Sequence, residues 1–359
     1  MVFYVKKHWA IIFPIIAWLL YMGKSFVLWA GFDVFVALGL AGAVLSAVHH
    51  AEVIAHRAGE PAGTLVLAIA ITIIEVALIV SLMLAGGQDT LTLARDTVFA
   101  AIMIILTGII GLCLLVGGVR YREQHFGMHG TSAALVTLTA ISVLSLILPN
   151  YTTSVPGPVY SVSQLIFVAI ISLVLYGTFV MVQTVRHRSY FLPDDGSNDD
   201  APALSKPSTA MTVISGTFLL ICLAAVVLLA KKLAPVIEDK VVALGAPESA
   251  VGVIVALVIL LPEGLAAYRA AKKNKLQTSL NLALGSALAS IGLTIPAVAA
   301  VSIMTGMTIT LGIDTKSTVM LVLSLFTVAL SFTTGRTTVM QGVVLLVLFA
   351  VYLFLTIVP

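Results

Sequence analysis

The sequence predicts an all-α polytopic membrane protein. Of its 359 residues, 60% are hydrophobic and 10% are charged, and the mean hydropathy is +1.13. In soluble globular proteins about a quarter of all residues are charged. The much lower charged fraction of this chain excludes a soluble globular protein. The apolar runs are too many and too long to fill one core, which indicates a polytopic helical membrane protein.

Hydropathy along the chain predicts eleven transmembrane helices. The first runs from about Trp9 to Met22 and follows Lys6 and Lys7. No small-residue cleavage site follows Tyr21, so we expect a retained helix rather than a signal peptide. The other ten spans are expected at about residues 32–55, 62–85, 97–118, 130–149, 161–184, 210–230, 249–270, 278–304, 317–334 and 339–357.

The positive charges predict how the chain is oriented in the membrane. Loops on the side of the N-terminus carry thirteen of the Lys and Arg residues, and loops on the opposite side carry six. Cytoplasmic loops are enriched in these residues. We therefore expect a multi-pass protein of the cell (inner) membrane with a cytoplasmic N-terminus and an external C-terminus.

One long polar stretch divides the helices that follow the first into five and five. It lies between Arg186 and Ser208, and it has no apolar periodicity, which indicates a flexible cytoplasmic loop. Because each set crosses the membrane an odd number of times, the sets have opposite orientations, as in the inverted repeats of many secondary transporters. The predicted parts are an N-terminal helix (1–31), a first five-helix repeat (32–185), an acidic loop (186–209) and a second five-helix repeat (210–359).

Two glutamates lie inside apolar spans, Glu75 in the third and Glu263 in the eighth. A charge at the centre of a membrane helix costs about 2.5–3.5 kcal/mol on translocon scales, and such residues usually face a cavity or an ion path. Gly59-Glu60-Pro61 precedes the first acid, and Gly245-Ala246-Pro247 precedes the second at nearly the same distance. The repetition predicts a duplicated ion site; the alternative is two separately buried, protonated glutamates.

The inverted repeats allow these two acids to meet. Each lies about 14 residues into its helix, which is roughly 21 Å at 1.5 Å per residue. With helix tilt, this depth is near the middle of a hydrocarbon core of about 30 Å. Two carboxylates in one cavity of low dielectric constant must hold either protons or a cation. This exclusion predicts exchange of a cation for protons, and oxygen ligands favour hard ions such as Ca²⁺, Na⁺ or K⁺.

Five neighbouring residues are expected to support this site. Thr72 lies three residues before Glu75, where its hydroxyl either ligates the ion or packs between helices. Pro262 removes a backbone donor and is expected to kink or open its helix, which frees carbonyl groups. Asn281, Gly285 and Ser286 lie on the next helix, where small residues indicate close packing and Ser286 is also a candidate ligand.

Two other polar groups have both a functional and an ordinary interpretation. His49, Glu52 and His56 share one face at the end of the second span, which suits a proton relay or metal site as well as a solvated helix end. The loop residues Asp194, Asp195, Asp199 and Asp200 either gather cations at the cytoplasmic mouth and modulate transport, or form an ordinary solvated loop.

These motifs resemble the ChaA-type cation/proton antiporters of the CAX branch of the Ca²⁺:cation antiporter superfamily. The similar segments are GEPAGTLVLAIAITIIEVAL, LPEGLAAYRAAKKNKLQTSLNLALGSALASIGLTIP and SFTTGRT. The resemblance implies eleven helices, and it implies that Glu75 and Glu263 carry the cation and the protons. The family repeats read Gly-Asn-x-x-Glu, whereas this chain has Ile71-Thr72-Ile73-Ile74-Glu75 and Ile259-Leu260-Leu261-Pro262-Glu263; the missing amide ligands favour Na⁺ or K⁺.

Secondary antiport by alternating access is the leading hypothesis, with cytoplasmic Ca²⁺, Na⁺ or K⁺ leaving against external protons. A cation channel and a transporter of another divalent cation are the alternatives. An intramembrane enzyme is not expected, since no nucleophile–base pair or zinc motif lies in the spans. No GxxxxGK[ST] motif occurs, so we expect no nucleotide, no nucleic acid and no cofactor, only the lipid bilayer and inorganic cations as partners.

Overall fold

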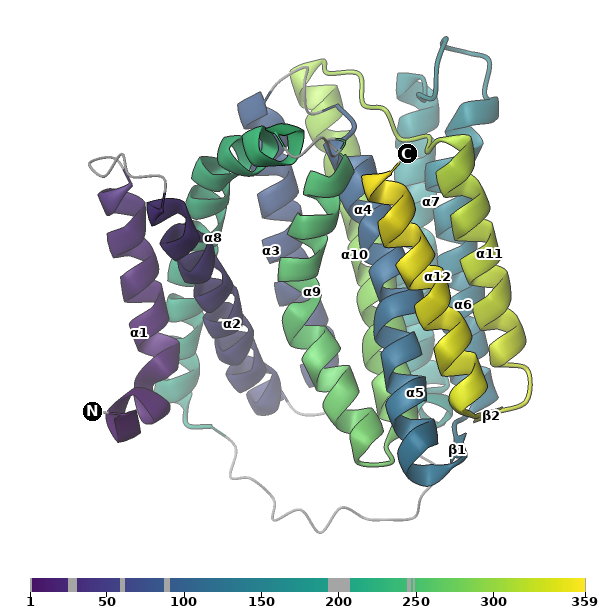
Figure 1. Ribbon diagram of the computed structural model, residues 1–359, viewed down its shortest axis with the longest axis horizontal. Coiled ribbons are helices and arrows are strands. Elements are labelled where there is room, and N and C mark those ends of the chain that lie inside the picture. The colour runs from purple at the N-terminus through teal and green to yellow at the C-terminus, as the bar shows by residue number, and fades with distance from the viewer. Residues whose placement is uncertain are drawn as a thin grey trace. The chain divides into compact units, whose positions relative to one another are not determined.

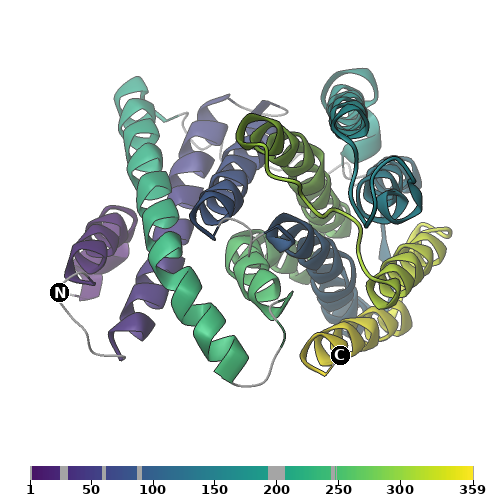
Figure 2. The same ribbon diagram turned by 90° about the horizontal axis from the view of Figure 1, so that it is seen from above.

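The structure, a computed structural model, describes residues 2–24, 31–58, 62–86, 91–192, 207–243, 247 and 249–358. Helices make up nearly all of it (Figures 1 and 2). The chain forms two compact units. The first unit consists of residues 1–86 and 198–245, and the second consists of residues 87–197 and 246–359.

The first unit is built from four helices: α1 (Val2–Gly23), α2 (Phe32–Ala58), α3 (Ala62–Gly86) and α8 (Thr209–Ala243). Helices α2 and α8 each pack against all the other helices of this unit, and their contact with each other is the most extensive. Glycine allows α1 to approach α2 closely. A Cβ atom at Gly42 would lie 2.4 Å from the ring of Phe13, and one at Gly39 would lie 2.5 Å from Leu20, the close approach that small residues permit in membrane helix pairs.

Helix α8 extends well beyond the predicted end at residue 230. The sequence interpretation stopped there because Lys231 and Lys232 follow, but the helix continues through Pro235 to Ala243. The ammonium group of Lys232 donates to the carbonyl of Tyr21 at 3.1 Å and lies 4.3 Å from the centre of its ring. A long lysine side chain that reaches a polar helix end in this way is compatible with an otherwise apolar helix.

The second unit contains the remaining helices. They are α4 (Leu93–Met103), the π-helical η2 (Ile104–Ile109), α5 (Ile110–Tyr121), α6 (Met128–Ser142), η3 (Val143–Ile147), η4 (Leu148–Tyr151), α7 (Val162–Met181), η5 (Val182–Arg186), η6 (Arg188–Phe191), α9 (Ser249–Lys272), α10 (Leu276–Thr305), α11 (Thr315–Ser331) and α12 (Val339–Ile357). Helices α4 and α5 and the η2 segment between them follow one another without a loop. Helix α10 is central, because it packs against α4, α5, α6, α7 and α9.

Short backbone contacts fix the ends of the second unit. Strands β1 (Gln124–His125) and β2 (Arg336–Thr337) pair antiparallel, and a single bridge joins Val159 to Thr310. The sequence did not predict these contacts. Each joins two loops that the predicted topology places on the same side of the membrane, so the contacts agree with the alternation of the spans.

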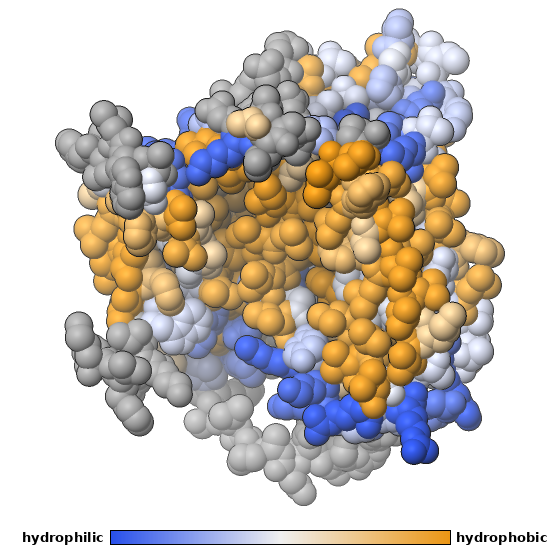
Figure 3. Space-filling model, in the orientation of Figure 1, coloured by the Kyte–Doolittle hydropathy of each residue, from blue (hydrophilic) through white to orange (hydrophobic). Residues whose placement is uncertain are grey.

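The eleven predicted helices are confirmed in number. Among the described residues, eight helices have the length and hydropathy of a membrane span, and three shorter apolar helices accompany them at Trp9–Gly23, Ile69–Leu84 and Thr315–Ser331. Figure 3 shows apolar side chains over the flanks of α11 and α12, with polar ones near the ends of the helices. The repeat boundaries at 32–185 and 210–359 stay a prediction, since each compact unit takes helices from both halves of the chain.

Candidate cation and proton site

Glu75 lies near the middle of α3 in the first unit. Its side chain is 3% exposed, and so is that of Thr72. Residues three apart share a helix face, so both polar groups lie on one buried face. Ile73 is 50% exposed and lies on a different face of α3, so the polar groups and the exposed apolar surface are on different sides of this helix.

Glu263 and Ser286 are in contact in the second unit. Glu263 lies on α9 and is half-buried, and Ser286 lies on the adjacent helix α10 and is 9% exposed. The hydroxyl group of Ser286 donates to Oε2 of Glu263. A hydroxyl that donates to a carboxylate stabilises its ionised form, which is the form that binds a cation.

A π-helical segment lies beside this contact, and the sequence did not predict it. Segment η2 ends at Ile109, whose Cδ1 atom lies 3.2 Å from the position that a Cβ of Gly264 would take. Within η2, the Thr107 hydroxyl donates to the carbonyl of Met103 at 2.5 Å. π-Helical turns are rare and frequently occur at functional sites. The Thr107-Gly108 pair is the one sequence signal that could have marked this place.

The other predicted supporting residues have different surroundings. Helix α9 passes through Pro262 without a break, so the expected opening of the helix is not seen, although the proline still lacks the N–H that would bond to Val258. A Cβ at Gly285 would meet no atom within 4 Å. The amide of Asn281 donates to the carbonyl of Phe191 at 2.6 Å and accepts from Gln277 at 2.9 Å, a helix-end network.

Replacing Ser286 with alanine should lower the apparent affinity for the transported cation by about tenfold. A hydrogen bond to a charged group contributes about 1.5–3 kcal/mol, and about 1.4 kcal/mol is tenfold in affinity. The measurement is the cation dependence of exchange in proteoliposomes. Thr294→Val, on the same helix, is the matched control, because the described residues offer its buried hydroxyl no hydrogen-bond partner. Equal affinities for Ser286→Ala and the parent would contradict a role for this contact.

The predicted histidine face lies at the end of α2. Glu52 and His56 are exposed there. His49 is half-buried and its ring lies 5.2 Å from that of Trp9. The neighbouring His50, which was not predicted, bonds to the carbonyl of Ala10 at 3.1 Å. These surroundings favour the interpretation as a solvated helix end over a metal site.

The described part of the chain contains no group of three or more His, Cys, Asp and Glu residues arranged to hold a metal ion. Asp194, Asp195, Asp199 and Asp200 lie outside the described residues, so their modulatory role stays a prediction. Glu75 and Glu263 belong to different compact units, and their meeting in one cavity also stays a prediction.

The chain is similar to a known protein family and to individual transport proteins over most of its length. The profile of the sodium/calcium exchanger protein family matches residues 27–185 and 214–358. The putative ionic transporter y4hA of Sinorhizobium fredii is 49% identical over 89% of this chain and 87% of its own. The sodium-potassium/proton antiporter ChaA of Escherichia coli is 37% identical over 97% of this chain and 95% of its own.

Solved structures share the fold. Native YfkE matches with a TM-score of 0.73 at 20% identity, over 98% of this chain and all of the other. The H⁺/Ca²⁺ exchanger CAX matches with a TM-score of 0.73 at 15% identity, over 97% of this chain and 88% of the other. At such identities these similarities bear on the fold alone, and they agree with the all-α membrane architecture.

Proposed function

The chain belongs to the sodium/calcium exchanger protein family, and we propose that it is a secondary antiporter that exchanges cytoplasmic Na⁺, K⁺ or Ca²⁺ for external protons. It is a multi-pass membrane protein, and its relatives are transporters rather than enzymes. In this proposal Glu75 and Glu263 carry the cation and the protons by turns, and access to them alternates between the two sides of the membrane.

The observation that carries the proposal is the placement of an acid in the interior of each of two helices, α3 and α9, which are equivalent in the predicted repeats. Glu75 is almost fully buried on α3, and Glu263 receives a hydroxyl hydrogen bond on α9. An ionised carboxylate loses its hydration when it is buried, which costs free energy. Only a bound cation, a proton or a strong hydrogen-bond donor offsets this cost. A pair that must be neutralised binds either ions or protons, and this requirement couples the two fluxes.

Sodium or potassium is the favoured cargo, with calcium next. The ChaA protein of E. coli, at 37% identity, is named a sodium-potassium/proton antiporter, and the ChaA protein of Bacillus subtilis, at 25% identity over 59% of this chain, is named a Ca²⁺/H⁺ antiporter. The repeats here carry Thr72 and Pro262 in addition to the acids but no amide side chain. Fewer oxygen ligands suit a monovalent ion better than Ca²⁺, which takes 6–8.

The proposed orientation follows from charge. The predicted topology assigns thirteen basic residues to the side of the N-terminus and six to the opposite side. We therefore propose that the N-terminus lies in the cytoplasm and the C-terminus outside the inner membrane. Helix α12, which ends the chain, then runs outward, and β1 and β2 lie at the cytoplasmic side of the second unit.

The proposal is tested with purified protein in liposomes that contain a pH-sensitive dye. After an acid interior is established, external Na⁺, K⁺ or Ca²⁺ is added separately, and each transported ion should alkalinise the interior with saturable kinetics. We expect responses to Na⁺ and K⁺, and a smaller one to Ca²⁺. Cation flux without proton movement would favour a channel, and no response to any of the three ions would contradict antiport of these cations.

A further inference from the structure

A pocket at one end of the second unit combines charged and apolar walls. Its volume is about 270 Å³. It is lined by α4, by the start of α11 and by the last turns of α12, with these residues: Arg95, Asp96, Phe99, Ile313, Asp314, Lys316, Ser317, Met320, Tyr352, Leu355 and Thr356. The predicted topology places it at the external boundary of the membrane. It is therefore distinct from the two glutamates, which lie in the interior of their helices.

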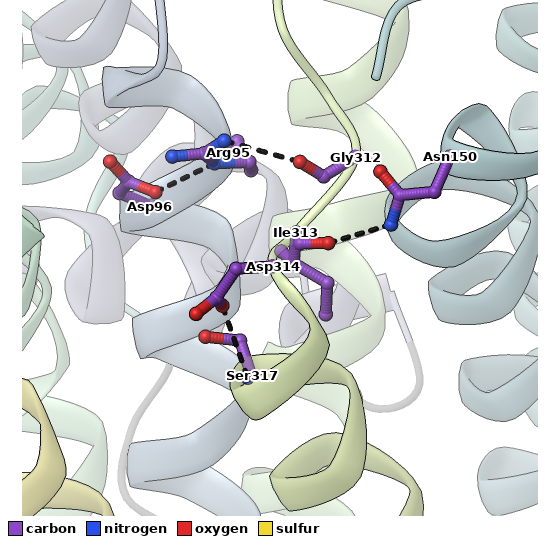
Figure 4. Close-up of polar contacts among 7 residues, drawn as sticks. All are labelled: Arg95, Asp96, Asn150, Gly312, Ile313, Asp314 and Ser317. Atoms are coloured by element: carbon purple, nitrogen blue, oxygen red, sulfur yellow. Dashed lines mark hydrogen bonds and ion pairs between the residues drawn. The ribbon is translucent and has the colours of Figure 1, made fainter. Parts of the chain in front are cut away.

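The pocket has two basic residues, Arg95 and Lys316, and two acidic residues, Asp96 and Asp314. Some of their hydrogen-bonding groups already have partners within the protein. Nε of Arg95 donates to Asp96 at 2.8 Å, and the Arg95 guanidinium also donates to the carbonyl of Gly312 at 3.1 Å (Figure 4). Asp314 is the N-cap of α11 and accepts from the backbone N–H of Ser317 at 3.0 Å (Figure 4). The asparagine Asn150 holds the same loop through the carbonyl of Ile313 at 2.6 Å.

Lys316 retains most of its bonding capacity. Its ammonium group donates to the carbonyl of Leu355 at 2.9 Å, and among the described residues it makes no ion pair. An ammonium has three donors, so two are left for a ligand. Asp314 is exposed. Its carboxylate has about four lone-pair positions, and one of them accepts the hydrogen bond from the backbone N–H of Ser317.

Helices α11 and α12, which line this pocket, also carry exposed apolar faces. The face on α11 adjoins Lys316, whereas the face on α12 lies on the side of that helix away from Tyr352 and Thr356. On α11, the exposed face consists of Val319, Val322, Leu323, Phe326 and Leu330. On α12, it consists of Val343, Val347, Val351, Phe354 and Ile357. Both sets follow helical spacing, so each forms one stripe, and Figure 3 shows apolar side chains over these flanks. Such stripes are suited to the acyl chains of lipid.

We propose that this pocket binds the headgroup of a zwitterionic phospholipid that carries a primary ammonium, of the phosphatidylethanolamine type. The phosphodiester contacts Lys316 and Arg95, the ammonium donates to Asp314 and Asp96, and the acyl chains lie along the exposed face of α11. The pocket has no net formal charge and Asp96 is paired with Arg95, so an anion alone would leave Asp314 unmatched, and a cation alone would leave Lys316 unmatched. Its volume is below the roughly 300–1,000 Å³ of drug-sized sites, which suits a small headgroup.

The test is native mass spectrometry of the full-length protein in detergent, titrated with phosphatidylethanolamine, phosphatidylcholine or phosphatidylglycerol of the same acyl chains. The first adduct should form with phosphatidylethanolamine at a concentration about fivefold lower than with the other two lipids, the scale of a partly exposed ion pair. Asp314→Asn should remove this preference. Asparagine caps helices as well as aspartate does, so α11 should be retained in this variant.

Two further variants separate the headgroup contacts from general charge effects. Lys316→Gln should weaken binding of all three lipids, because it removes a phosphate contact. Arg336→Gln removes one positive charge from an exposed side chain at the other end of the unit and should leave the preference unchanged. Equal binding of the three lipids by the parent protein would overturn the proposal, and so would an unchanged preference in Asp314→Asn. Displacement of the lipid by equimolar free phosphoethanolamine would overturn the assignment to a lipid.

Discussion

Glu75→Gln and Glu263→Gln are each expected to reduce cation/proton exchange to the level of liposomes without protein. Glutamine keeps the volume of the side chain but can neither take up a proton nor give an ion its negative charge. If a pair of carboxylates alternates between protons and a cation, loss of either charge stops the cycle. Exchange is measured with the pH-sensitive dye, and correct folding is checked by the elution of the purified variant as a single symmetric species.

The matched control for these substitutions is Glu123→Gln. Glu123 lies between α5 and β1, its side chain is 52% exposed, and its nearest basic partner, Arg336, is 3.9 Å away. Exposed pairs of this kind contribute little to stability, so exchange should be retained. Glu75→Asp and Glu263→Asp keep the charge on a shorter side chain and should retain some transport. Wild-type exchange by either glutamine variant would contradict the two-carboxylate site.

The helices could be predicted from the sequence because length and hydropathy alone decide whether a segment spans a membrane. The predicted helix bounds were wrong where a charged residue was taken to mark the end of a helix. Lys231 and Lys232 marked the end of the seventh span, yet Lys232 reaches Tyr21 at the end of α1 and α8 continues. The pairing of β1 with β2 depends on residues more than 200 positions apart, and hydropathy carries no signal for it.

The site could be predicted in part for a similar reason. A carboxylate in an apolar helix is costly, so Glu75 and Glu263 were evident without a structure. Ser286 had two interpretations, packing or ligation, and its hydrogen bond to Glu263 could not be deduced from spacing, since it depends on how α9 and α10 are rotated. Asp96 was not predicted to be a site residue; only folding brings it together with Lys316 and Tyr352 at one pocket.

Reversing the proton gradient is expected to reverse the direction of cation movement, whereas reversing the membrane potential should change the rate by less than about twofold. Two carboxylates are neutralised by one divalent cation or by about two protons, so a Ca²⁺ cycle moves about two protons per ion. A monovalent cation neutralises one carboxylate while the other keeps its proton, so a Na⁺ or K⁺ cycle moves about one. In both cycles the charge of the occupied site is the same in each direction.

The measurement uses proteoliposomes in which a gradient of a membrane-permeant anion, thiocyanate, sets the potential without K⁺ while Na⁺/H⁺ or Ca²⁺/H⁺ exchange is followed. Moving one uncompensated charge across the membrane is worth about 2.3 kcal/mol per 100 mV, and each 1.4 kcal/mol is about tenfold. For an exchanger that carried such a charge, the equilibrium ratio of the cation across the membrane would therefore change by more than tenfold over 100 mV. A steep dependence on potential would contradict this charge balance. It would mean either that one monovalent cation displaces both protons of the pair or that a third charged group moves with the cation.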